Sequence, residues 1–543
     1  MQDASACLVD ERGRVLFAVE EERLVRRKNT GELPEQAIRA CLAHVGATWR
    51  DLDHVAFSLR PWEGVVTRAM DLLRGWPDTR PMLQSRGASW LRVVDLPREL
   101  RRRFGPGRHR WHWVRHHDAH AASAFLPSPF ESAAVLIVDG SGEIESLTHH
   151  VGRSTQVARL GGLGDRDFPH SLGYFYSALT EWAGFVPATS EGKTMGLSAF
   201  VSVEPALLAA FREMVRDDGR LDLSWFGFQH GGTRGYFSPR WVERFGPART
   251  SEAALEERHF AVAAAGQRRL EEVVFARLRA LHRATRLDRL CLAGGVALNA
   301  VMNGKIREET PFREVFVQPA AHDAGTAWGA ALLARGPDAP RPAPLTSMAL
   351  GPDLGAFTPP DGAERPANLA EMVATLLADG EMVGWVQGRL ELGPRALGQR
   401  SILADPRAPD MADRVNRTVK RRETFRPFAP AVLESAAGDW FEGTMTPFMT
   451  TVCRVRPDQR ARVPAITHVD GTARPQLVSA EFNPRLHALI TAFAARTGVP
   501  MVLNTSFNLR DEPIVNRPEE ALRDFEATDL DALVLGDWLM RKR

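Results

Sequence analysis

Lysine, cysteine and long apolar runs are all scarce in this chain of 543 residues. The four cysteines (Cys7, Cys41, Cys291 and Cys453) lie far apart and form no Cys-x-x-Cys pair, which excludes a zinc finger and argues against a disulfide framework. No apolar run is long enough to span a bilayer, and no secretory signal pattern is present. We therefore expect a cytoplasmic protein with no membrane partner.

Net charge is also low, at +2, which argues against a general nucleic-acid partner. Only five of the 69 basic residues are lysines, so a lysine inside a dense motif is more telling than an arginine. The hydrophobic fraction of 44% and charged fraction of 25% are typical of a globular protein. The length predicts at least two domains.

Two histidines four residues apart open an alanine-rich run, Arg115–Phe125. If this run is helical, His116 and His120 project from one face. The following run, Ile137–Glu143, predicts a buried strand that delivers Asp139 into the turn Gly140-Ser141-Gly142. Two imidazoles and a carboxylate suit a transition metal, and a glycine-rich turn suits a phosphate.

Each of these motifs also has an ordinary structural interpretation. The histidines can belong to the core or the surface of a helix, and the Asp-Gly-Ser-Gly sequence can be a hairpin turn. A third segment, Ala321–Ala330, favours the functional interpretation because it places Asp323 before a helix of small residues. Two histidines with two carboxylates favour iron, manganese or zinc over magnesium, which prefers oxygen ligands.

The remaining N-terminal pattern alternates strands and helices. We expect a hairpin from Ala6–Val9 and Val15–Val19, and helices over about 35–45 and 252–285. A buried strand at Leu290–Ala293 runs into Gly294-Gly295-Val296-Ala297-Leu298-Asn299, a turn that either approaches a nucleotide or only packs a strand against a helix.

A proline-rich stretch divides the chain. Residues 341–366 are expected to form a linker between domains at 1–340 and 367–543, and a new helix and strand follow at about 369–379 and 382–386.

The part after this stretch is rich in groups that bind anions. Arg395 and Arg426 lie beside glycine or proline, and the rare Lys420 lies among Asn416, Arg421 and Arg422, although Arg421 and Arg422 also fit a solvated basic face. Several cations that converge on one cavity would bind a di- or triphosphate. The residues expected to contribute are Arg395, Lys420, Arg426, Arg474, Asn504, Ser506 and Asn508.

Together these motifs resemble the NodU/CmcH family of O-carbamoyltransferases over nearly the whole chain. The resemblance implies an α/β protein with an actin/hexokinase-like N-terminal domain and a YrdC-like C-terminal domain. In that family, carbamoyl phosphate and ATP form carbamoyl adenylate in the C-terminal domain. The carbamoyl group then passes to a hydroxyl of a natural product, such as an antibiotic, in the N-terminal domain.

The resemblance also assigns residues. It implies iron(II) ligands at His116, His120, Asp139 and Asp323, and a nucleotide against Gly140–Gly142 and against Gly294, Gly295 and Asn299. Arg395, Lys420, Arg426 and Arg474 match positions that bind carbamoyl phosphate or ATP, with Mg²⁺ as a further ion. His117 and Asp118 are candidate general bases through their proximity in sequence.

One feature departs from the family pattern, and one charged segment has no assigned role. The chain begins Met1-Gln2-Asp3, so Gln2 occupies a position where the family has histidine. The charged run Glu21–Lys28 is expected to be a solvated surface segment.

The expected acceptor and partners follow from the same resemblance. The partner is expected to be a small hydroxylated acceptor, bound by loops such as 161–168 and 225–236, and a homodimer stays open. The alternative function is a threonylcarbamoyl-type transferase acting on tRNA, which the low net charge disfavours. A non-catalytic nucleotide-binding regulator is a third interpretation.

Overall fold

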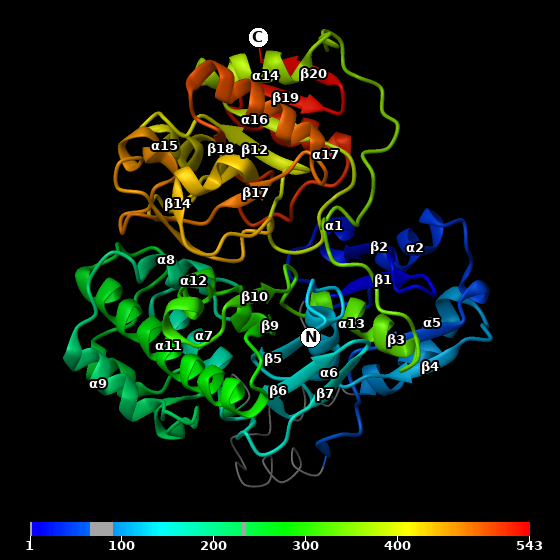
Figure 1. The fold of residues 1–543 in the computed structure, drawn as a ribbon, viewed down its shortest axis with the longest axis vertical. Helices are drawn as coiled ribbons and strands as arrows, with labels where there is room; N and C mark the ends of the chain where they lie inside the picture. The colour runs from blue at the N-terminus through cyan, green and yellow to red at the C-terminus, as the bar shows by residue number, and fades with distance from the viewer. Residues whose placement is uncertain (1–2, 66–90, 231–234, 543) are drawn as a thin grey trace.

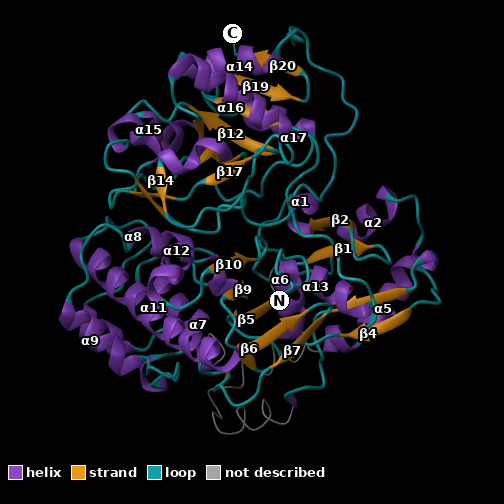
Figure 2. Ribbon diagram, in the orientation of Figure 1, coloured by secondary structure: helices purple, strands orange, loops and turns teal. Residues whose placement is uncertain are grey.

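The computed structural model describes residues 3–65, 91–230 and 235–542. Two bodies built around separate sheets face one another in Figure 1, and the long segment after residue 335 runs between them. Helices and strands alternate in both bodies (Figure 2), so the predicted α/β class is confirmed.

The main N-terminal sheet has the strand order β10-β9-β5-β6-β7, with β8 paired to β6. β5 runs parallel to β9 and antiparallel to β6, so the sheet is mixed. Its strands are β5 (Ser132–Val138), β6 (Glu145–Arg153), β7 (Gln156–Arg159), β8 (Arg166–Asp167), β9 (Arg289–Ala293) and β10 (Glu314–Val317).

β5 is apolar on both faces because both faces are covered. Ala134, Leu136 and Val138 pack in one cluster, with residues of α7 and α11, and the alternate residues 133, 135 and 137 pack in another, with residues of α6 and α13. This alternation is the period of two that a strand imposes. The covering helices are α6 (His116–Phe125), α7 (Leu172–Trp182), α11 (Glu257–Thr285), α12 (Ala300–Glu309) and α13 (Ala324–Ala334).

A smaller lobe precedes this sheet in the chain. The predicted hairpin is present, because β1 pairs antiparallel with β2, and β3 pairs with β4 in parallel. Its elements are β1 (Ser5–Val9), β2 (Val15–Glu20), α1 (Glu21–Val25), α2 (Glu35–His44), β3 (His54–Phe57), α5 (Leu96–Phe104) and β4 (Arg110–Trp113). Three more helices, α8 (Glu191–Leu197), α9 (Pro205–Met214) and α10 (Pro239–Phe245), lie on the α11 side.

The expectation of a solvated charged run at Glu21–Lys28 is wrong for its first half. Glu21, Glu22 and Arg23 are buried, as is the preceding Glu20. Arg23 donates from Nε to Glu20 at 2.8 Å and from Nη2 to the carbonyl of Gly393 at 2.9 Å. Burial of these charges is compensated because Arg23 pairs with Glu20 and Glu22, and Glu21 accepts from the amides of Gln36 and Ala37. The bond from Arg23 to Gly393 joins the N-terminal lobe to the C-terminal body.

The C-terminal body is a seven-stranded sheet with the order β17-β13-β18-β12-β11-β19-β20. Its strands are β11 (Val383–Val386), β12 (Arg400–Ala404), β13 (Ala429–Leu433), β17 (Gln476–Val478), β18 (Met501–Ser506), β19 (Ala532–Leu535) and β20 (Trp538–Arg541). A small sheet of β14 (Phe441–Glu442), β15 (Cys453–Val455) and β16 (Thr472–Ala473) adjoins it. Its α-helices are α14 (Leu369–Ala378), α15 (Met411–Arg414), α16 (Pro484–Thr497) and α17 (Pro518–Glu526).

The segment between α13 and α14 contains only isolated β-bridges, at Ala349 and Glu364. It is anchored at both ends: the Leu345 amide donates to Pro127 at 2.7 Å, and the Glu364 amide donates to Leu539 at 2.8 Å. The domain division at 341–366 stays a prediction.

The contact between α6 and α13 depends on Gly329. A β-carbon built there would lie 1.8 Å from the carbonyl oxygen of Ala119, which is backbone and cannot move aside. We predict that Gly329→Ala forces the helices apart and lowers the free energy of unfolding by about 1–3 kcal/mol or more. Gly161→Ala is the control because the position is open and has ordinary φ, and equal denaturation midpoints for the two variants would contradict the prediction.

Candidate functional site

The four predicted metal ligands meet at one point. α6 presents His116 and His120 on the same face, the turn after β5 carries Asp139, and Asp323 immediately precedes α13. The ligand atoms all lie within 4.8 Å of one another. Three separate parts of the sequence therefore converge on one centre.

Distances between the candidate ligand atoms of the centre run from 3.2 to 3.9 Å. His116 Nε2 lies 3.3 Å from Asp139 Oδ2 and 3.4 Å from Asp323 Oδ1. His120 Nε2 lies 3.2 Å from His116 Nε2, and 3.7 and 3.9 Å from the same two carboxylate oxygens. Two nitrogens and two oxygens thus surround a common point that a single divalent ion fits.

The chemistry of this donor set also fits a transition metal. His116 Nδ1 faces the carbonyl of Ser58 at 3.3 Å, an arrangement that turns Nε2 toward the centre. Burial lowers the pKa of His116, but Asp323 and Asp139 outweigh it and hold this pKa well above the usual value. Burial lowers the pKa of His120 and so favours its neutral imidazole, the form that ligates metal.

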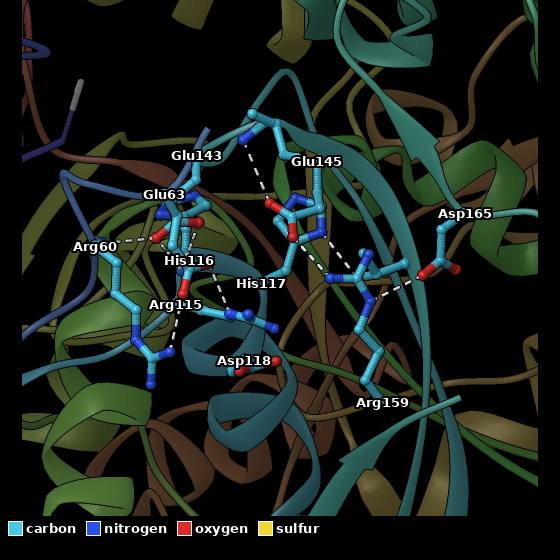
Figure 3. Close-up of polar contacts among 12 residues, drawn as sticks. Arg60, Glu63, Arg115, His116, His117, Asp118, Glu143, Glu145, Arg159 and Asp165 are labelled. Carbon is cyan, nitrogen blue, oxygen red and sulfur yellow. Dashed lines mark hydrogen bonds and ion pairs between the residues drawn. The ribbon is translucent and has the colours of Figure 1, made fainter. Parts of the chain in front are cut away.

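Glu143 is not a candidate ligand, but its hydrogen bonds fix the position of His116. Its carboxylate accepts hydrogen bonds from the backbone amides of His116 at 3.0 Å and of Arg60 at 2.8 Å (Figure 3). It thereby ties the start of α6 to the segment that supplies the Ser58 carbonyl. Glu143 ends the sequence motif Ile137–Glu143, but the sequence alone predicts no role for it.

The two predicted general bases lie outside this centre. His117 donates or accepts at Thr148 Oγ1, 2.8 Å from its Nδ1, and burial holds its pKa well below the usual value. Asp118 is half-exposed on another face of α6, and its carboxylate lies 4.0 Å from His150 Nδ1. Neither lines the cavity described below. The helix explains this placement, because one and two residues after His116 turn a side chain by about 100° and 200°. The general-base roles of His117 and Asp118 stay predictions.

The residues expected to contact a nucleotide either have structural contacts, line the cavity described below, or do both. Gly294 has φ +89°, and a β-carbon there would lie 2.3 Å from the carbonyl oxygen of Val138, so close packing on β5 explains this glycine. The Gly295 amide donates to Asp139 Oδ1 at 2.8 Å and so orients a candidate metal ligand. Asn299 caps α12 by accepting from the Met302 amide at 3.0 Å. Gly295 and Asn299 line the cavity, as do Gly140, Ser141 and Gly142.

In the C-terminal body, Lys420 is buried at the end of the helical segment Val415–Lys420, beside the end of β18. Its Nζ donates to Asn508 Oδ1 at 2.7 Å, to the Ser506 carbonyl at 2.6 Å and to Ser506 Oγ at 3.1 Å. Burial, with help from Arg422 and Arg426, lowers the pKa of Lys420 well below its usual value. Asn504, deeper on β18, donates to Gln476 Oε1 at 2.9 Å.

Four arginines, Arg395, Arg422, Arg426 and Arg474, line the same cavity as Lys420. Desolvation and Arg426 lower the pKa of Arg395 to about 10, and desolvation lowers the pKa of Arg422, Arg426 and Arg474. Within the described residues, none of the four forms a salt bridge. Arg422 was expected on a solvated face, but it packs over Phe428 and donates to Asn416 at 2.7 Å. Arg421 is exposed, as expected for a residue on a solvated basic face.

One cavity of about 3240 Å³ joins the two clusters. It is lined by His116, Asp139 and Asp323 at the N-terminal end and by the four arginines, Lys420, Asn504, Ser506 and Asn508 at the C-terminal end. Lys28 and Arg23 also line it, so the charged run that the sequence left without a role reaches this cavity. Gln2 lies outside the described residues.

Comparison with known proteins assigns both bodies. A family model described as the carbamoyltransferase N-terminus matches residues 1–332, and one described as the carbamoyltransferase C-terminus matches residues 374–542. The chain is 39% identical to nodulation protein NolNO of Sinorhizobium fredii, over 100% of this chain and 79% of that protein. It is 42% identical to nodulation protein NolO of Bradyrhizobium diazoefficiens, over 79% of each.

Among solved structures, HypF of T. kodakarensis is similar at 14% identity and a TM-score of 0.30, over 62% of this chain and 47% of that one. In the three described stretches of the chain, no helix has both the length and the apolar character needed to cross a membrane.

We predict that Asp323→Asn weakens iron(II) binding by more than the roughly 10–100-fold that loss of an outer-shell partner costs, because it removes a charged ligand. The measurement is bound metal after anaerobic reconstitution. Asp118→Asn is the matched control, since Asp118 faces away from the centre. Equal metal content in the two variants would rule out the four-ligand site.

Proposed function

The chain belongs to the carbamoyltransferase family, and we propose that it is an ATP-dependent O-carbamoyltransferase whose acceptor is a small hydroxylated natural product. Carbamoyl phosphate is the carbamoyl source and carbamoyl adenylate the intermediate. Activation takes place at the C-terminal end of the cavity and transfer at the N-terminal end.

The observation that carries the activation step is the set of arginines without carboxylate partners. Desolvated guanidinium groups that repel one another are costly unless an anion joins them. Arg395, Arg422, Arg426 and Arg474 line one end of the cavity together with Lys420. Phosphate groups supply the missing charge and match the planar guanidinium fork. Mg²⁺ enters with ATP, as it usually does with nucleotide phosphates.

The proposed reaction balances in three steps. Water cleaves carbamoyl phosphate to carbamate and inorganic phosphate. A carbamate oxygen then attacks the α-phosphorus of ATP, the bond to the β-phosphate breaks, and pyrophosphate leaves. Finally the acceptor hydroxyl oxygen attacks the carbamoyl carbon of the adenylate. The bond between this carbon and the phosphate oxygen of AMP breaks, and a phosphate oxygen of AMP receives the proton of the acceptor hydroxyl.

At the transfer end, the chain's own residues hold the geometry. His116, His120, Asp139 and Asp323 would hold iron(II) or a similar ion, which when bound supplies Lewis acidity toward a carbonyl or phosphate oxygen. Glu143 and the Gly295 amide fix His116 and Asp139 in place. The long cavity gives the adenylate a path between the two ends.

The two ends make separable predictions. Lys420→Met should abolish carbamoyl-phosphate-dependent pyrophosphate release, because the ammonium that orders the Ser506–Asn508 loop and faces the anion is lost. His120→Ala should retain pyrophosphate release and lose carbamoyl transfer. Pyrophosphate assays and mass spectrometry of the acceptor measure the two activities.

Arg421→Ala is the control for Lys420→Met. Its side chain is a neighbouring cation, but it is exposed and donates only to the Ala527 carbonyl. Wild-type protein that releases no pyrophosphate with carbamoyl phosphate and ATP would refute the proposed activation step.

A further inference from the structure

The loop 421–427 carries two of the activation-end arginines together with one carboxylate. Glu423 follows Arg422 directly and precedes Arg426 by three residues, and it is the only acidic residue of the loop. Burial lowers the pKa of both arginines, and Glu423 opposes this lowering, so its carboxylate lies within electrostatic reach of both guanidinium groups. A desolvated guanidinium gains most from a carboxylate partner, so Glu423 is the partner that these arginines would ordinarily take.

Glu423 is paired instead with the N-terminal body. Lys193, 230 residues earlier on α8, donates from Nζ to Glu423 Oε1 at 2.8 Å. Within the described residues, neither of the two forms any other ion pair. Burial raises the pKa of Glu423, but Lys193 outweighs burial and holds this pKa below its usual value, so the carboxylate is charged at neutral pH. α8 lies on the side of the N-terminal body that faces the C-terminal body (Figure 1).

An aromatic contact holds the loop at the same place. The Phe425 ring lies 6.1 Å from the Phe185 ring, measured between centroids, and a β-carbon at Gly196 would lie 3.9 Å from its edge. Phe185 also supports the lysine, whose Nζ lies 5.3 Å from the centroid of the Phe185 ring. The ion pair therefore forms between a lysine and a loop that are both fixed on the N-terminal body.

A second cation of the N-terminal body favours the same position of the carboxylate. The Arg249 guanidinium lies 4.7 Å from the Phe185 centroid and donates to the Ala183 carbonyl at 2.7 Å. Burial lowers the pKa of Arg249, and Glu423 opposes this lowering, so the carboxylate is within its electrostatic reach too. Lys193 and Arg249 both line the cavity, and together they attract Glu423 away from the arginines of its own loop.

The arginines of the loop are left with neutral partners. Arg422 donates from Nε to Asn416 at 2.7 Å and packs over Phe428 at 4.6 Å. Arg426 lines the cavity and forms no salt bridge within the described residues. Neutral partners satisfy hydrogen bonds but leave the charge uncompensated, so an incoming anion meets no internal competitor.

We propose that Lys193 is a positioning residue for the activation step: it holds Glu423 away from Arg422 and Arg426, so that both guanidiniums stay free for phosphate. Lys193 acts through Glu423 and does not itself contact the anion. Because the lysine belongs to one body and the loop to the other, the activation end is prepared for anions only where the two bodies are docked. This inference rests on the proposed function and adds a residue that prepares its activation end.

The test measures pyrophosphate affinity by isothermal titration calorimetry and KM for ATP in carbamoyl-phosphate-dependent pyrophosphate release. Lys193→Met frees Glu423 to pair with the arginines, so affinity should fall about tenfold or more and KM should rise by a similar factor. Glu423→Gln should bind pyrophosphate at least as tightly as the wild type. The double variant Lys193→Met/Glu423→Gln should recover wild-type affinity to within about twofold.

Arg454→Met is the matched control. It removes another ion pair between the same two bodies, Arg454 with Glu308 at 3.2 Å, and neither residue lines the cavity. This variant should keep wild-type affinity. Lys193→Arg keeps the charge and should also bind pyrophosphate as the wild type does.

Two results would overturn the proposal. If Glu423→Gln weakened pyrophosphate binding as much as Lys193→Met does, the ion pair would serve only to hold the loop. If the double variant stayed as weak as Lys193→Met, the lysine would bind the anion directly. Glu423→Gln decides the first point even if Lys193→Met fails to fold. Wild-type protein that binds pyrophosphate but releases none from ATP would refute the activation step, whereas the affinities of the variants would still decide the role of Lys193.

Discussion

The close contact between α6 and α13 is the constraint on which the transfer centre depends. Gly329 allows the α13 backbone to approach the Ala119 carbonyl. This approach brings Asp323 to within 4 Å of the imidazoles of His116 and His120, which lie about 200 residues earlier in the sequence. Small residues dominate both helices because any larger side chain at the contact would separate the ligands. The geometry of the four candidate metal ligands is therefore a consequence of backbone packing, and not only of which residues they are.

The second cluster follows the opposite physical logic. The four ligands at the transfer end bring two carboxylates to two imidazoles, so opposite partial charges already compensate one another. At the activation end, four guanidiniums and one ammonium gather with carbonyl and amide oxygens but without a carboxylate of their own. Such a site is stable in the folded protein at a cost, which a bound anion relieves. The chain thus keeps one end ready for a cation and the other for anions.

Sequence reasoning found the parts of the site that local patterns encode. Spacing of four placed His116 and His120 on one helical face, and strand-turn patterns located Asp139 and the hairpin that holds it. It failed where burial depends on distant partners: Arg23 is buried because it reaches Gly393, 370 residues away. Arg422 was mistaken for a solvated residue because its partners Asn416 and Phe428 are visible only in the fold. Gly294 carried a nucleotide interpretation, although its glycine is required by the Val138 carbonyl.

The arrangement of charge along the cavity gives a reason for housing both steps in one chain. A mixed anhydride of carbamate and AMP is anionic at the phosphate and reactive at the carbonyl. In the proposed reaction, the arginines and Lys420 at the activation end would hold its phosphate, whereas the carboxylates of Asp139 and Asp323 lie at the transfer end. Those carboxylates would repel an anionic intermediate, so an ion bound at the candidate metal centre would be the group that attracts its phosphate or carbonyl oxygen.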